Sequence, residues 1–146
     1  MSGRVSVCSL KNEGGERMRL VTGGYAQGKL DYVLEAVGRE NCRILESVSE
    51  EDGSRDEEKK TAVFNHFHLW VRERLRQGGN PEEELNAFLE REPDCIIISD
   101  EIGCGIVPLE PEEREYRERT GRILTALAFR AEEVDRVLCG IGQRIK

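Results

Sequence analysis

The stretch RLVTGGYAQGKLDYV, residues 19–33, carries the most specific pattern in this chain of 146 residues. The short apolar run Met18–Thr22 leads directly into glycines, which is typical of a buried parallel strand that enters a tight turn. The next segment, Gly23–Lys29, has the G-x-x-x-x-G-K spacing of a phosphate-binding loop. A helix is predicted over Lys29–Val37, and Gly38 should end it.

A loop of this kind binds phosphate mainly through its backbone. Its glycines let N–H groups turn toward phosphate oxygens, and the following helix presents its positive N-terminal end. Lys29 adds a point charge for the terminal phosphates. A plain glycine turn is the alternative, but the strand and helix on either side favour a nucleotide site. Its predicted residues are consecutive: Gly23, Gly24, Tyr25, Ala26, Gln27, Gly28, Lys29 and Leu30.

Leu30 departs from the pattern, because this position normally carries the Ser or Thr hydroxyl that coordinates magnesium. Another residue must then hold the metal. Asp31 and Asn65 are candidates, but the strongest are Asp100 and Glu101, which follow an apolar strand containing three isoleucines. The end of such a strand is where a P-loop sheet places its metal-binding acid. The alternative for this acidic pair is an ordinary strand-to-loop turn.

The only two histidines, His66 and His68, form an H-x-H pair where a predicted strand enters a helix. Two imidazoles without a carboxylate or thiolate nearby in the sequence are a weak metal signal, so we expect packing or polar contacts. Because α/β sheets bind ligands at strand ends, both rings are also candidates for substrate contact.

Strands and helices alternate along the rest of the chain. This alternation predicts an α/β fold with a mostly parallel sheet that is covered on both faces and closed by a C-terminal hairpin. Residues 1–17 are expected to be a flexible leader, residues 18–146 a single domain, and residues 49–60 a solvated loop. The remaining expected strands are 42–48, 61–65, 94–99, 134–139 and 141–145, and the remaining helices are 65–77, one that starts at Asn80 and Pro81, and a long one from Pro111.

The amino-acid composition argues against several classes of partner and site. A net charge of -7 argues against binding to a nucleic-acid backbone. No apolar run approaches the roughly 20 residues that span a bilayer, and the N-terminus lacks a signal-peptide core, so we expect a cytoplasmic protein. The five cysteines are odd in number and form no C-x-x-C pair, which disfavours a disulfide framework or a zinc site. Cys95 and Cys139 lie in apolar runs and are expected to be buried in strands.

Three C-terminal segments, DEIGCGIVP, EYRERTGR and VLCGIGQRIK, resemble in order and spacing the signature segments of the adenosylcobinamide kinase/adenosylcobinamide-phosphate guanylyltransferase family of cobalamin assembly. VTGGYAQGK resembles the phosphate loop of that family, and NHFHLWVRERL resembles a segment in which the family has an acidic residue and a Leu-Trp pair. The likeness covers about Met18–Lys146 with one long gap.

The resemblance implies a P-loop kinase-like three-layer domain, often a homotrimer, that uses ATP or GTP with Mg²⁺ to phosphorylate a corrinoid substrate before GMP transfer. By the same resemblance, Gly23–Lys29 would hold the nucleotide phosphates. Glu101 would be the acid near the metal or the attacking hydroxyl. Arg117 and Arg122 would contact phosphate or a neighbouring subunit.

Three departures from the family pattern narrow the expected activity. Leu30 replaces the hydroxyl, Asn65 stands where the family tends to have an acid, and the shortened segment 47–60 contains no histidine where the family carries GMP covalently. We therefore expect phosphoryl transfer to adenosylcobinamide or a related alcohol rather than guanylyl transfer. One alternative is a non-catalytic nucleotide- or corrinoid-binding protein of the same pathway, and another is GMP transfer through His66 or His68.

Overall fold

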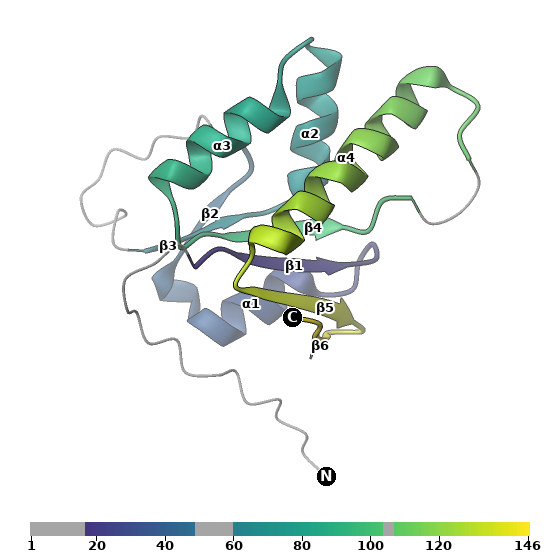
Figure 1. Cartoon of the computed structure of the whole chain (residues 1–146). Coiled ribbons are helices and arrows are strands. Elements are labelled where there is room, and N and C mark those ends of the chain that lie inside the picture. The colour runs from purple at the N-terminus through teal and green to yellow at the C-terminus, as the bar shows by residue number, and fades with distance from the viewer. Residues whose placement is uncertain (1–16, 49–59, 104–106) are drawn as a thin grey trace.

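The computed structural model describes residues 17–48, 60–103 and 107–146, which form an α/β fold around one six-stranded sheet (Figure 1). The strand order is β2-β3-β4-β1-β5-β6, and only β6 runs antiparallel to its neighbour. The strands are β1 Arg19–Gly23, β2 Cys42–Leu45, β3 Thr61–Phe64, β4 Ile96–Asp100, β5 Glu133–Leu138 and β6 Ile141–Arg144. The helices are α1 Lys29–Val37, α2 Phe67–Arg76, α3 Pro81–Arg91 and α4 Pro111–Arg130, with a 3₁₀ turn at Arg39–Asn41. The expected mostly parallel sheet and the C-terminal hairpin are confirmed.

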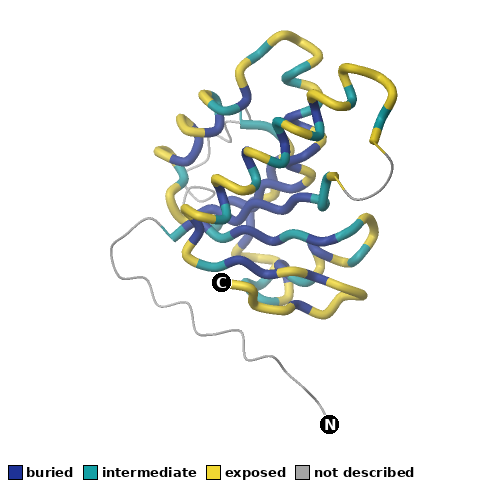
Figure 2. The backbone as a smooth tube through the Cα atoms, turned by 45° about the vertical axis from the view of Figure 1, so that its right-hand side comes forward, coloured by how far each residue is buried: buried dark blue, intermediate teal, exposed yellow. Residues whose placement is uncertain are grey.

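Helices cover both faces of the sheet, with α1 on one side and α2, α3 and α4 on the other (Figure 1). Because successive strand residues point to opposite faces, each central strand contributes to two apolar clusters. Leu20 and Ile97 belong to the cluster under α2, α3 and α4, whereas Val21 and Ile98 belong to the cluster over α1. The central strands are accordingly buried along most of their length (Figure 2).

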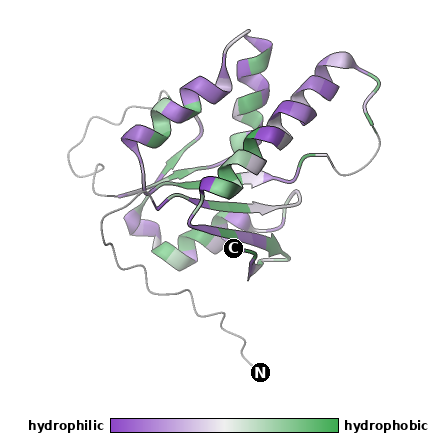
Figure 3. Cartoon of the chain, in the orientation of Figure 1, coloured by the Kyte–Doolittle hydropathy of each residue, from purple (hydrophilic) through white to green (hydrophobic). Residues whose placement is uncertain are grey.

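Local sequence signals set most helix boundaries. The Asn80 side chain accepts a hydrogen bond from the Glu83 N–H, and Pro81 occupies the first turn of α3, as the sequence predicts. The helix α2 begins at Phe67, two residues later than expected, because His66 has a left-handed backbone with φ 51°. The first half of α4 is mostly hydrophilic, whereas its second half is more hydrophobic (Figure 3).

The expectation that Cys139 is a buried strand residue is wrong. Cys139 is exposed and lies in the two-residue turn between β5 and β6. Its φ is 50° and that of Gly140 is 74°, so these two residues form a tight hairpin turn and do not continue the strand. Cys95 is buried as expected, and Cys42 is also buried. Cys8 and Cys104 lie outside the described residues.

Most of the expected leader and of the solvated loop lies outside the described residues, which exclude 1–16, 49–59 and 104–106. Arg17, the last residue of the expected leader, donates its backbone N–H to the Pro93 carbonyl at 3.1 Å. Among the helices that the structure describes, none is long and apolar enough to cross a membrane.

Candidate functional site

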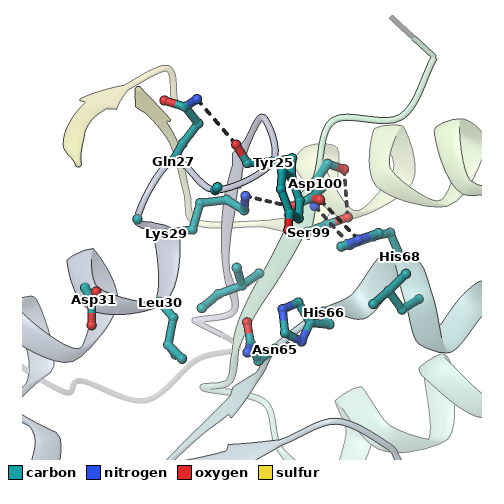
Figure 4. A pocket seen from close by; sticks show the side chains of 14 residues that line it. Tyr25, Gln27, Lys29, Leu30, Asp31, Asn65, His66, His68, Ser99 and Asp100 are labelled. Atoms are coloured by element: carbon teal, nitrogen blue, oxygen red, sulfur yellow. Dashed lines mark hydrogen bonds and ion pairs between the residues drawn. The ribbon is translucent and has the colours of Figure 1, made fainter. Parts of the chain in front are cut away.

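A cavity of about 500 Å³ lies where the loop after β1, the start of α2 and the end of β4 meet (Figure 4). Parallel strands bring their carboxyl ends to the same edge of a sheet, so residues far apart in the sequence converge there. The cavity contains most of the site residues that the sequence predicts. Its lining is Tyr25, Ala26, Gln27, Gly28, Lys29, Leu30, Asp31, Asn65, His66, His68, Leu69, Ile98, Ser99 and Asp100.

The loop at residues 23–28 contains left-handed backbone and a close approach to a neighbouring strand. Gly28 precedes α1 with φ 79°, and Ala26 is also left-handed with φ 53°. Gly23 lies so close to β5 that an added Cβ would come within 2.5 Å of the Val137 carbonyl oxygen. The first glycine of the motif is therefore required by contact with the neighbouring strand, and Gly28 by its backbone conformation.

Lys29 is the central cation of the cavity. Its side chain is 9% exposed, and Nζ lies 2.6 Å from Oδ1 of Asp100 and donates a hydrogen bond of 2.6 Å to the Gly24 carbonyl. A buried ammonium needs such partners, because an unpaired charge in a low-dielectric site is costly. The loop and the end of β4 thus hold one positive and one negative charge in the same cavity.

His68 holds Asp100 at two points. The backbone N–H of Asp100 donates to Nδ1 of His68 at 3.1 Å, and Nε2 lies 3.3 Å from the carboxylate oxygen Oδ2. Because a backbone N–H can only donate, Nδ1 must carry the lone pair and the neutral ring carries its proton on Nε2. Burial lowers the pKa of His68 below its usual 6.5, although the Asp100 carboxylate partly opposes this shift.

Asn65 and His66 form the wall opposite the phosphate-binding loop. Asn65 is 6% exposed, and its amide nitrogen lies 3.4 Å from Nδ1 of His66. The same His66 nitrogen lies 3.1 Å from the Glu46 carboxylate. His66 itself is exposed and occupies the N-cap position of α2. The H-x-H pair therefore divides its contacts, with His68 directed to Asp100 and His66 to Glu46.

The remaining predicted acids and arginines lie outside the cavity, except Asp31, which is part of its lining. Glu101 does not line the cavity, and its carboxylate accepts hydrogen bonds from Nε and Nη2 of Arg136 at 2.7 and 3.2 Å. Asp31 lies at the rim, where it pairs with Arg39 at 3.1 Å. Arg117 and Arg122 are on α4 and do not line the cavity, and Arg122 pairs with Glu118 one turn away.

The cavity offers few oxygen ligands to a metal ion. Within the described part of the chain, no group of three or more His, Cys, Asp or Glu side chains could hold one. Mg²⁺ needs fewer protein ligands than such a group provides, because it is usually bound through one or two carboxylates together with waters and substrate phosphates. The Asp100 carboxylate and the Asn65 amide oxygen fit that limited role, whereas Leu30 contributes no ligand atom.

Sequence reasoning missed two features of the site. Ser99, which is fully buried, lines the cavity one residue before Asp100. The pairing of His68 with Asp100 joins α2 to β4, and no local pattern reports a contact between two separate elements. The only available signal was that both residues follow the ends of predicted strands.

Comparison with known proteins identifies the family. The family model for cobinamide kinase / cobinamide phosphate guanyltransferase matches residues 39–145, which begin after the phosphate-binding loop. The Bifunctional adenosylcobalamin biosynthesis protein CobU of Escherichia coli (strain K12) is 37% identical over 79 residues, which are 53% of this chain and 44% of that protein. The protein of the same name from Salmonella typhimurium (strain LT2) is 41% identical over 51 residues, which are 35% of this chain and 28% of that protein. The matched part is thus less than half the length of either relative. Because the family model matches most of the chain, the chain belongs to the cobinamide kinase / cobinamide phosphate guanyltransferase family.

Proposed function

We propose that this chain binds GTP or ATP with Mg²⁺ at the loop Gly23–Lys29 and transfers the terminal phosphoryl group to adenosylcobinamide or a related alcohol. The observation that carries the proposal is the Lys29 ammonium, which lies in the cavity between a loop carbonyl and the Asp100 carboxylate. Membership of a family described as cobinamide kinase and guanyltransferase supports the same reaction class.

The residues of the cavity have distinct roles in this proposal. The loop amides and Lys29 bind and neutralise the phosphate oxygens, which is the main contribution that an enzyme makes to phosphoryl transfer. Asp100 and Asn65 would hold the Mg²⁺ ion, which would supply positive charge to neutralise the negative charge that develops on the phosphate group. The acceptor oxygen forms a bond to the terminal phosphorus, the bond to the bridging oxygen breaks, and a nucleoside diphosphate leaves. The acceptor hydroxyl loses its proton to water.

A second candidate function is nucleotide or corrinoid binding without turnover. Leu30 favours it, because the chain lacks the hydroxyl that normally coordinates the metal at this position. Guanylyl transfer has less support, since residues 47–60 contain no histidine. If His66 or His68 carried GMP, incubation with labelled GTP would leave an acid-labile label on the protein.

The direct test is to incubate the purified protein with Mg²⁺ and either GTP or ATP, with and without adenosylcobinamide. Nucleoside diphosphate release is measured, and the corrinoid is followed by mass spectrometry. We expect a mass increase of one phosphoryl group. Tight nucleotide binding without a phosphorylated product would overturn the kinase proposal and favour the binding protein.

The binding assignment is tested separately by Lys29→Ala. Loss of the ammonium should weaken nucleotide binding by about tenfold or more, because a charge-assisted contact to phosphate is removed. Lys146→Ala is the matched control, since the Lys146 ammonium donates to carbonyls at the end of α4 and does not line the cavity. Equal nucleotide affinity in Lys29→Ala and the parent would refute the site.

A further inference from the structure

The phosphate-binding loop is joined to the C-terminal hairpin at one residue, Gln27. Its side-chain oxygen Oε1 accepts a hydrogen bond of 2.7 Å from the backbone N–H of Cys139, and its own carbonyl oxygen accepts one of 2.8 Å from the N–H of Gly140. The side-chain amide nitrogen lies 3.4 Å from the carbonyl of Tyr25, within the loop. Gln27 therefore contacts both the loop and the hairpin.

The hairpin turn has two donors that its own strands do not use. The β5–β6 ladder pairs Leu138 with Ile141, which leaves the N–H groups of Cys139 and Gly140 beyond the last pair. Both residues have positive φ, as a type I′ turn requires, although Cys139 is not a residue that favours this conformation. Gln27 satisfies both donors, so the turn and the loop stabilise each other's conformation.

Packing confirms that the loop and the hairpin fit closely. An added Cβ on Gly28 would lie 3.4 Å from Cα of Gly140, and one on Gly23 would overlap the Val137 carbonyl. The loop thus lies against β5 at its first glycine and against the turn at its last. A displacement of the hairpin would move the loop backbone with it.

We propose that Gln27 is a positioning residue that ties the phosphate-binding loop to the β5–β6 turn and so holds the loop amides in the geometry that grips the nucleotide. The inference rests on the proposed nucleotide-binding function. It adds that the C-terminal hairpin, which supplies no residue to the cavity lining, is part of the machinery that shapes it.

The test compares Gln27→Met with Gln27→Glu and Gln143→Met in the full chain. Met has nearly the length of Gln but no oxygen acceptor, whereas Glu keeps the acceptor for the Cys139 N–H. Gln143→Met makes the same chemical change at an exposed position of β6, outside the cavity lining. Each protein is studied by amide hydrogen exchange of residues 138–141, by thermal unfolding, and by titration with a fluorescent GTP analogue.

We expect Gln27→Met to speed exchange of the Cys139 amide and to weaken binding of the GTP analogue by about three- to tenfold, because one backbone-directed hydrogen bond is lost. Gln27→Glu should keep the Cys139 amide protected, and Gln143→Met should match the parent in exchange and affinity. The melting temperature of Gln27→Met should stay close to that of Gln143→Met, which separates positioning from general destabilisation.

Two other outcomes would overturn the inference in different ways. If the parent binds the analogue and Gln27→Met binds it equally well, Gln27 does not position the loop, while the proposed nucleotide site stands. If the parent itself binds neither the GTP analogue nor an ATP analogue, the proposed function fails and the inference fails with it.

Discussion

The Lys29 ammonium and the Asp100 carboxylate lie 2.6 Å apart, one at the start of α1 and the other at the end of β4. In the proposed function, a nucleotide phosphate that approaches Lys29 would compete with Asp100 for the same cation. Binding would then exchange one ion pair for another and would leave the carboxylate available to a metal ion that accompanies the phosphates.

The two neighbouring acids at the end of β4 should differ in function. Asp100→Asn should lower Mg²⁺-dependent phosphoryl transfer by about a hundredfold, because the cavity carboxylate that lies beside Lys29 loses its charge. Glu101→Gln should stay within about threefold of the parent, since Glu101 pairs with Arg136 outside the cavity. Initial rates over a range of Mg²⁺ concentrations provide the measurement. The reverse order of effects would show that Glu101 meets the metal.

Leu30→Ser should raise Mg²⁺-dependent phosphoryl transfer by about tenfold, because it restores a hydroxyl ligand next to Lys29. The same change should cost about 1 kcal/mol of stability, since Leu30 packs against the apolar cluster on the α1 side of the sheet. Leu30→Ala removes the same apolar contact without supplying a hydroxyl. Equal rates in the two variants would show that the missing hydroxyl does not limit the reaction.

The free energy of unfolding should decrease as the pH falls below about 6.5. Burial lowers the pKa of His68 in the folded chain, with the Asp100 carboxylate opposing in part, so the unfolded chain takes up its proton first. The stabilisation is fully present above the unfolded pKa and is lost as the pH drops through the folded one. Urea unfolding at a series of pH values measures the slope.

His68→Gln should remove that slope, because glutamine is polar but does not titrate. His66→Asn is the control, since asparagine tolerates the left-handed backbone at the start of α2 and leaves His68 in place. A slope that survives in His68→Gln would assign the pH dependence to another group. The Glu82 pKa, lowered by its hydrogen bond to Arg119, contributes only at more acidic pH.

Gly142→Ala should destabilise the fold by about 2 kcal/mol or more, because the new Cβ would lie 2.2 Å from the Tyr32 ring. The ring would have to move and give up its hydrogen bond of 2.9 Å to Asp135. Burial, together with this bond, raises the pKa of Tyr32 to about 12. Gly121→Ala in α4 is the matched substitution, since nothing lies within 4 Å of its added Cβ. Gly121→Ala should instead stabilise the fold by roughly 0.5–1 kcal/mol, because alanine has a higher helix propensity than glycine. Urea denaturation that finds both variants equally stable would contradict this packing.

Local patterns predicted the elements of this fold well. The bounds of α1 follow from the glycines on either side of it, and α3 begins where Asn80 and Pro81 place it. These signals involve residues within one turn of each other, so no tertiary contact is needed to interpret them. The start of α2 was less predictable, because His66 adopts a left-handed backbone that its residue type does not require.

The sequence by itself determined the α/β class, the phosphate-loop spacing and the strand ends at which site residues would gather, because hydrophobic periodicity and glycine positions act locally. Only the tertiary structure decided which of those residues meet. Strand order places β4 beside β1, and this brings Asp100 and His68 to Lys29 while Glu101 pairs with Arg136. The hairpin likewise reaches Gln27 only because β5 lies on the other side of β1. Adjacency of this kind depends on how the whole chain packs, which no short stretch of residues specifies.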